Sequence, residues 1–174
     1  MNQNVDWYPE RPPEFSEAGE FEAWIYGTDR PAEVGDYSFC GFAVRPKGKL
    51  PVHYPELRIG IAKSSPNSEE HRGYLAASVG VLELLASNSK VHIYSHHDIA
   101  VKILGEWLAT WHANGWKKSD RKPPAALEIC QRLWEVKESR SITMTAERVA
   151  RNDYRFYHIF NLLGARIEKM TGRQ

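Results

Sequence analysis

The chain lacks the features that mark membrane proteins, secreted proteins and metal-cluster proteins. Its apolar runs stay well short of the roughly 20 residues that a membrane-spanning helix needs, so no membrane partner is expected. The first 20 residues have no basic start and no apolar core, which argues against a secretory signal. Only two cysteines are present, Cys40 and Cys130, and they are not in a metal-ligand spacing. These absences predict a cytoplasmic protein with two buried, reduced thiols.

A strong charge of one sign is also absent. The 174 residues have a formal net charge of +1, and 42% of them are hydrophobic, which is enough for one domain with a full core. The charge is unevenly distributed, however. Residues 1–100 contain 9 Lys and Arg against 14 Asp and Glu, whereas residues 101–174 contain 14 against 8. This asymmetry is compatible with an anion-binding face in the second half, although chance scatter over a solvated surface would look the same.

Residues 1–20 differ in composition from the rest of the chain. They are rich in proline and acid and can bury little apolar surface, so we expect a flexible tail whose removal leaves the fold intact. Trp7 and Tyr8 could dock this tail onto the domain or onto a protein partner. We expect the folded domain to span residues 21–170.

The remaining sequence alternates between strand-like and helix-like patterns. Short β-branched and aromatic runs predict five strands, at residues 21–26, 37–44, 57–62, 91–94 and 141–145. Apolar positions at helical spacing predict helices at residues 69–87, 97–103, 104–113, 124–137 and 152–170. This order predicts an α/β fold with a mixed, five-stranded sheet flanked by helices. A right-handed crossover is expected at the first helix.

Residues 91–133 hold the most informative pattern, VHIYSHHDIAVKILGEWLATWHANGWKKSDRKPPAALEICQRL. An apolar strand ends in the cluster SHHD at residues 95–98, and three tryptophans follow at helical spacing, Trp107, Trp111 and Trp116. A basic segment at residues 117–122 then leads into a final helix. This order resembles the second half of a bacterial type 1 ribonuclease H. In that family the strand ends in a catalytic Asp, a helix carries paired tryptophans, and a basic handle grips the nucleic acid. The resemblance implies the ribonuclease H fold.

The resemblance also implies a set of carboxylates that hold two divalent metal ions and cut the RNA of an RNA–DNA hybrid. Compared position by position, this chain lacks them. Gly27 stands at the end of the first strand, Tyr74 in the first helix and His96 at the end of the fourth strand. Phe156 stands near the last carboxylate position, and the family's histidine loop is shortened to residues 146–153. Neutral Gly and Tyr with one His cannot neutralise two Mg²⁺ ions, so we expect a catalytically inactive member without a cofactor.

A remodelled metal site is the alternative. Acidic residues lie close to each of these positions, two residues later on the strands and one helical turn earlier on the helix. With two histidines they give one candidate set of ligands: Asp29, Glu70, His96, His97 and Asp98. Imidazole would favour Zn²⁺ or Mn²⁺ over Mg²⁺. The other interpretation is that these are ordinary turn and cap residues.

The basic segment predicts a nucleic-acid-binding surface, which we call the handle. Its candidate residues are Trp116, Lys117, Lys118, Arg121 and Lys122, which surround a single acid, Asp120. By the resemblance they would contact backbone phosphates, and such contacts bind nucleic acid without reading its sequence. A solvated corner between two helices is the other interpretation. A second basic stripe could be formed by Arg148, Arg151 and Arg155.

Three functions remain open at this point. The favoured one is a catalytically inactive ribonuclease H-like protein that binds a duplex or an RNA–DNA hybrid through the handle. The second is a protein-interaction or regulatory module that reuses the fold, in which residues 1–20 would matter most. The third is a nuclease with a remodelled His/Asp metal site that would use Mn²⁺ or Zn²⁺.

Overall fold

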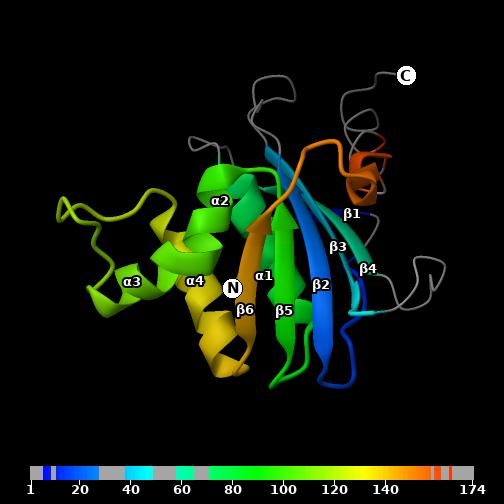
Figure 1. Ribbon diagram of the computed structural model, residues 1–174, viewed down its shortest axis with the longest axis horizontal. Coiled ribbons are helices and arrows are strands. Elements are labelled where there is room, and N and C mark those ends of the chain that lie inside the picture. Colours follow the sequence, from blue (N-terminus) through cyan, green and yellow to red (C-terminus); the bar gives the residue numbers. More distant parts are fainter. Residues whose placement is uncertain are drawn as a thin grey trace.

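A mixed β-sheet with helices packed on one face forms the body of the protein (Figure 1). The computed structural model describes residues 6–8, 11–27, 38–48, 58–64, 71–157, 159–161 and 165. The strands are β1 (Asp6–Tyr8), β2 (Glu20–Gly27), β3 (Ser38–Pro46), β4 (Arg58–Ser64), β5 (Lys90–Ser95) and β6 (Thr143–Arg148). They lie in the order β1-β4-β3-β2-β5-β6. The pairs β1–β4, β3–β4 and β2–β3 are antiparallel, and the pairs β2–β5 and β5–β6 are parallel.

This arrangement confirms the mixed sheet of five strands that the sequence predicts, with boundaries within a few residues of those expected. The sixth strand, β1, was not predicted. It pairs with β4, where Trp7 lies opposite Ala62, and it covers an edge that would otherwise expose unpaired backbone groups. Three residues are too few to give an alternating pattern in the sequence, which is why the pattern of residues 1–20 indicates only a tail.

The helices follow from the distribution of apolar residues. Helix α1 (Arg72–Leu84) is buried at every residue from Gly73 to Leu82, because it lies between the sheet and α4 (Leu127–Ser139). Helix α4 is amphipathic and buries Cys130, Leu133 and Val136. Each large apolar side chain buried in this way contributes roughly 1.5–3 kcal/mol relative to an exposed one. The sheet and these two helices therefore form the main core.

One continuous helical stretch precedes the handle. It consists of α2 (Asp98–Lys102), the π-helical turn η3 (Ile103–Trp107) and α3 (Leu108–Ala113). The sequence predicts two helices here, and the expected boundary falls where the π-turn begins. The opposite face of the sheet carries a smaller cluster in which Trp24 packs with Phe156 and Ile159 from the last helical segment. That segment begins with η4 (Tyr154–Phe156), and residues 162–164 and 166–170 of the predicted last helix lie outside the described residues.

Both cysteines are buried free thiols, as the sequence predicts. Burial raises the pKa of the Cys40 thiol to about 12. The thiolate is the reactive form of cysteine, so Cys40 is chemically inert in the folded protein. Within the described residues, the helices are too short or too polar to cross a membrane.

The described part of the N-terminal segment lies against the domain, in contrast to the flexible tail expected from its composition. The backbone N–H of Phe15 donates to the carbonyl of Leu84 at 2.8 Å, and the Phe15 ring packs on Phe21 with centroids 4.7 Å apart. The guanidinium of Arg58 also lies over the Phe15 ring, 4.6 Å from its centre. The side chains of Trp7 and Tyr8, which could have served as docking groups, lie outside the described residues.

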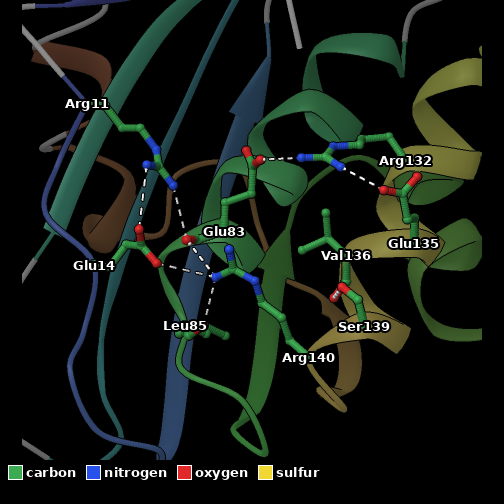
Figure 2. A network of polar contacts seen from close by, with 9 residues as sticks. All are labelled: Arg11, Glu14, Glu83, Leu85, Arg132, Glu135, Val136, Ser139 and Arg140. Carbon is green, nitrogen blue, oxygen red and sulfur yellow. Dashed lines mark hydrogen bonds and ion pairs between the residues drawn. The ribbon is translucent and has the colours of Figure 1, made fainter. Parts of the chain in front are cut away.

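An arginine at the end of α4 holds this segment in place (Figure 2). Arg140 donates to the carbonyls of Glu83 and Leu85, at 2.9 and 3.0 Å, and pairs with the Glu14 carboxylate at 3.5 Å. Arg11 reaches the same Glu83 carbonyl at 3.1 Å. These carbonyls belong to the C-terminal end of α1, where cationic donors are favourable. The N-terminal segment is therefore connected to both helices of the core.

Deleting residues 1–15 should destabilise the domain. The deletion removes the partly buried Phe15 ring, the hydrogen bonds from Phe15 and Arg11 to the end of α1, and the Glu14–Arg140 ion pair. Their loss should lower the free energy of unfolding by at least about 2 kcal/mol. Thermal unfolding should show this as a fall in Tm of roughly 4–8 °C for a domain of this size. The control is Glu17→Ala, an exposed residue whose loss should change Tm little. An unchanged Tm after the deletion would support the flexible tail instead.

Candidate functional site

The three positions at which the family resemblance implies carboxylates come together at one end of the sheet. Gly27 ends β2, Tyr74 lies in the first turn of α1, and His96 directly follows β5. The Tyr74 hydroxyl lies 2.9 Å from Nε2 of His96, and the two rings meet edge to face with centroids 5.4 Å apart. The three positions therefore lie together in the fold, and a hydrogen-bonded tyrosine–histidine pair occupies two of them.

Gly27 is required at its position because α1 approaches it closely. A Cβ atom there would lie 2.8 Å from the backbone nitrogen of Tyr74 and 2.9 Å from the carbonyl carbon of Gly73. Real Cβ atoms do not approach backbone atoms so closely, so a larger residue would have to displace the helix. An aspartate cannot occupy this position without moving α1 away from β2.

Aromatic side chains surround this pair. The Tyr26 ring lies 5.3 Å from His96 and 5.9 Å from Tyr74, and Phe156 lies 6.2 Å from His96. Phe160 packs edge to face on Tyr26 at 4.7 Å. Phe156 stands near the last carboxylate position and is fully buried. Sequence reasoning identified Phe156 but missed Tyr26 and Phe160, because nothing in the linear pattern places β2 beside the last helical segment.

The described members of the predicted remodelled metal site have other roles. His97 caps α2 by accepting from the backbone N–H of Ala100 at 3.2 Å. Asp98 pairs with Lys102 at 3.5 Å, and His96 contacts Tyr74. Asp29 and Glu70 lie outside the described residues. Within the described part of the chain no three His, Cys, Asp or Glu side chains are placed to hold a metal ion.

These residues do not fit the pair of divalent ions that the family resemblance implies. Two hard cations require several anionic oxygens close together. Gly27 has no side chain and no space for one, and the Tyr74 hydroxyl is already hydrogen-bonded to His96. The described part of the site therefore offers hydrogen bonds and aromatic surface in place of metal ligands.

The handle is an ordered turn between α3 and α4 that projects from the body of the protein (Figure 1). Lys118 and Lys122 are joined by a backbone hydrogen bond of 2.9 Å, and Arg121 N–H donates to the Lys118 carbonyl at 2.9 Å. Asp120 accepts from the backbone of Lys122 at 2.9 Å. Lys117, Arg121 and Lys122 are exposed, and within the described residues only Lys118 of the handle has an acidic partner, Asp120 at 3.7 Å.

Aromatic packing anchors the handle at its start. Trp116 donates its backbone N–H to the Trp111 carbonyl at 2.6 Å, and its ring packs edge to face on His112 at 5.7 Å. His112 in turn stacks on Trp134 of α4 at 4.4 Å. Trp107, Trp111 and Trp116 are all partly buried against the core, so their main role is structural.

An ion pair between Arg72 and Glu128 ties the end of the handle to α1. Glu128 lies in the first turn of α4, directly after the handle, and Arg72 begins α1. Partial burial alone would raise the pKa of Glu128, but a backbone hydrogen bond and Arg72 together lower it below its ordinary value. A lowered carboxyl pKa means that this stabilisation is present at neutral pH and is lost as the pH falls through the lowered pKa.

Sequence comparison relates the chain to bacterial ribonucleases H. It is 27% identical over 93 residues to ribonuclease H of Rhizobium etli, a match that covers 53% of this chain and 62% of that protein. It is 33% identical over 78 residues to the Rhodopseudomonas palustris BisB5 enzyme, covering 45% of this chain and 49% of that protein. The chain thus spans about half the length of the curated relatives it matches. No family model matches the sequence.

Solved structures support the same fold. LC9-RNase H1, described as a type 1 RNase H with the type 2 active-site motif, superposes with a TM-score of 0.60 at 12% identity. That match covers 86% of this chain and 72% of the other. The PFV RNase H domain superposes with a TM-score of 0.52 at 15% identity, covering 86% and 90% of the two chains. The chain is thus similar to bacterial ribonucleases H over about half its length, and the superpositions show that it has a ribonuclease H-like α/β fold.

Proposed function

We propose that this protein is a catalytically inactive ribonuclease H-like protein that binds a nucleic-acid duplex or an RNA–DNA hybrid through the handle. The observation that carries the proposal is the ordered basic turn itself, in which Lys117, Arg121 and Lys122 are exposed and a hydrogen-bonded backbone holds their positions. Cations fixed in this way attract phosphates and release the counterions around them. Such binding depends on salt and does not depend on base sequence.

The contacts around Gly27 support the inactive part of the proposal. Two-metal hydrolysis needs carboxylates that hold both ions on either side of the scissile phosphate. Gly27 and Tyr74 supply no carboxylate, and His96 is hydrogen-bonded to the Tyr74 hydroxyl. The handle lies between α3 and α4, apart from these strand ends, so loss of the chemistry need not remove the binding.

The relatives suggest the kind of ligand. A foamy viral protease–reverse transcriptase, which shares this fold with a TM-score of 0.53 at 15% identity, has been solved with an RNA/DNA hybrid. A second structure of that viral protein, also with a TM-score of 0.53, contains double-stranded DNA. By analogy, duplexes of either kind are the ligands with which to test this chain.

The purified protein should not cleave an RNA–DNA hybrid in Mg²⁺. The physical reason is the missing negative charge at Gly27, Tyr74 and His96. Gel analysis of an end-labelled hybrid measures this directly. The same assay in Mn²⁺ and Zn²⁺ tests the remodelled site. Cleavage that a chelator stops and that His96→Ala abolishes would overturn the prediction.

Replacing Gly27 should destabilise the fold, even with the smallest side chain. Gly27→Ala places a Cβ against the backbone of α1 and should lower the free energy of unfolding by about 1–3 kcal/mol. Gly27→Asp should be at least as damaging, so the carboxylate cannot be restored at low cost. Gly105→Ala is the matched control, because the nearest atom to its Cβ would be Ala146 Cβ at 3.8 Å. Equal urea midpoints for the two alanine variants would show that α1 can move away.

Reversing the charge of the handle should nearly abolish duplex binding. Changing Lys117 and Lys122 to Glu replaces attraction for phosphates by repulsion, while each single change to Ala should lower the salt slope of binding by about 1. Fluorescence anisotropy with two duplexes of unrelated sequence should show the same losses for both. Surface changes of this kind should alter stability by no more than about 0.5 kcal/mol.

The matched control changes Lys47 and Lys90 to Glu. These two exposed lysines line a groove of about 350 Å³. The groove lies at the end of the sheet opposite to Gly27. Both double variants change the net charge equally, so a general electrostatic effect would weaken both. Retained binding in the handle variant, or equal loss in both, would count against the handle as the binding site.

A further inference from the structure

Two tyrosines in the last helical segment are unusually exposed. Tyr154 and Tyr157 have 62% and 56% of their surface accessible, and Ile99 at 41% is the third large exposed apolar residue in the described part of the chain. Phe156, between the two tyrosines, is fully buried in the cluster with Trp24. Because Phe156 fixes the rotation of the segment, the tyrosines three residues apart lie on its solvent side.

Two exposed arginines come shortly before these tyrosines in the chain. Arg148 at the end of β6 and Arg151, three residues before Tyr154, are both exposed, and neither has an acidic partner within the described residues. The acids near them are engaged or set back. Glu147 contacts His92 at 3.0 Å, and Asp153 is only partly exposed and has contacts of its own. Two exposed arginines without acidic partners and two exposed tyrosines thus lie within ten residues of the chain. We call these four residues the tyrosine platform: Arg148, Arg151, Tyr154 and Tyr157.

The tyrosine platform adjoins the strand-end site. Arg151 donates to the hydroxyl of Tyr26 at 3.0 Å, and its guanidinium lies 5.9 Å from the centre of that ring. Tyr26 in turn contacts His96. An extended ligand, such as a nucleotide strand, that lay across the ends of β2 and β5 would thus reach Arg151 next to the two tyrosines.

We propose that the tyrosine platform binds an unpaired nucleotide strand by stacking its bases on Tyr154 and Tyr157 while Arg148 and Arg151 hold its phosphates. The proposal rests on nucleic-acid binding as the proposed function and adds the form of the ligand, a duplex with a single-stranded tail. Paired bases hide their faces within the helix, whereas unpaired bases of any sequence present a surface that stacks on exposed aromatic rings. Arginines without acidic partners favour a polyanion over an apolar protein surface.

The test compares three probes of related sequence by fluorescence anisotropy: a blunt duplex, the same duplex with an unpaired tail, and the isolated tail. Each is made in DNA and RNA forms, so the two sources of an unpaired strand are compared directly. Wild type should bind the tailed duplex about tenfold more tightly than the blunt one or better. The double variant Tyr154→Ala and Tyr157→Ala should lose this gain and keep its affinity for the blunt duplex.

Two controls separate stacking from other effects. The double variant Tyr154→Phe and Tyr157→Phe keeps the rings and should keep the gain. Ile99→Ala removes exposed apolar surface elsewhere and should leave the gain unchanged. Arg148→Glu is a second probe of the same surface that leaves both rings in place, and it should reduce the gain. Thermal unfolding of each variant shows whether the domain is intact.

The outcomes distinguish this proposal from the one on the handle. If wild type binds blunt and tailed duplexes equally, or if the alanine variant keeps the gain, the tyrosine platform is not a nucleotide site even though the handle can still be one. A third outcome is that the isolated tail binds to wild type but not to the Tyr154→Ala, Tyr157→Ala variant, while the blunt duplex does not bind at all. In that case the tyrosine platform is supported and the handle proposal fails. Equal loss of blunt and tailed binding in the alanine variant would overturn the platform.

Discussion

The contact between β2 and α1 at Gly27 is the constraint on which the rest of the site depends. With no side chain between them, the helix backbone lies directly on the strand end and presents Tyr74 to His96. Clustered carboxylates without a metal repel one another and cannot all ionise. A hydrogen-bonded Tyr–His pair enclosed by aromatic rings has no such penalty, because its polar atoms are satisfied and its rings are packed. This end of the sheet is therefore built to be stable without metal ions.

The strand-end site and the handle depend on different contacts. The strand-end site is determined by how α1 lies on β2, whereas the handle is held by the Trp116–His112–Trp134 stack and by its own backbone hydrogen bonds. The Arg72–Glu128 ion pair joins α1, which carries Tyr74, to α4, which follows the handle. A change of residues at one place therefore leaves the contacts at the other unchanged, which is the physical basis of the proposal that the handle binds without catalysis at the strand ends.

Much of the fold could be predicted from the sequence because its signals are local. The apolar run of β2 and the helical spacing of apolar residues in α4 each extend over several residues, and the predicted boundaries lie close to the observed ones. The features that could not be predicted from the sequence all depend on contacts between distant segments of the chain. Three contacts join segments that are far apart in the chain: the pairing of β1 with β4, the ion pair between Glu14 and Arg140, and the packing of aromatic side chains around His96. The exposure of Tyr154 could not be predicted from the sequence either. The helical spacing of apolar residues in this segment does not show that Phe156 is buried while Tyr154 and Tyr157 are exposed.

Three residues in and just after the handle have a left-handed backbone conformation. Trp116 and Arg121 have φ of 64° and 68°, and Ala126 at the start of α4 has φ of 56°. This left-handed conformation costs roughly 1–2 kcal/mol for each residue with a Cβ atom. The backbone hydrogen bonds of Trp116 and Lys118 must offset this cost. A turn held against such strain has its shape before any ligand arrives. Its cations therefore lose little backbone freedom on binding phosphates, which is the condition under which a short basic loop can bind tightly without help from a metal site.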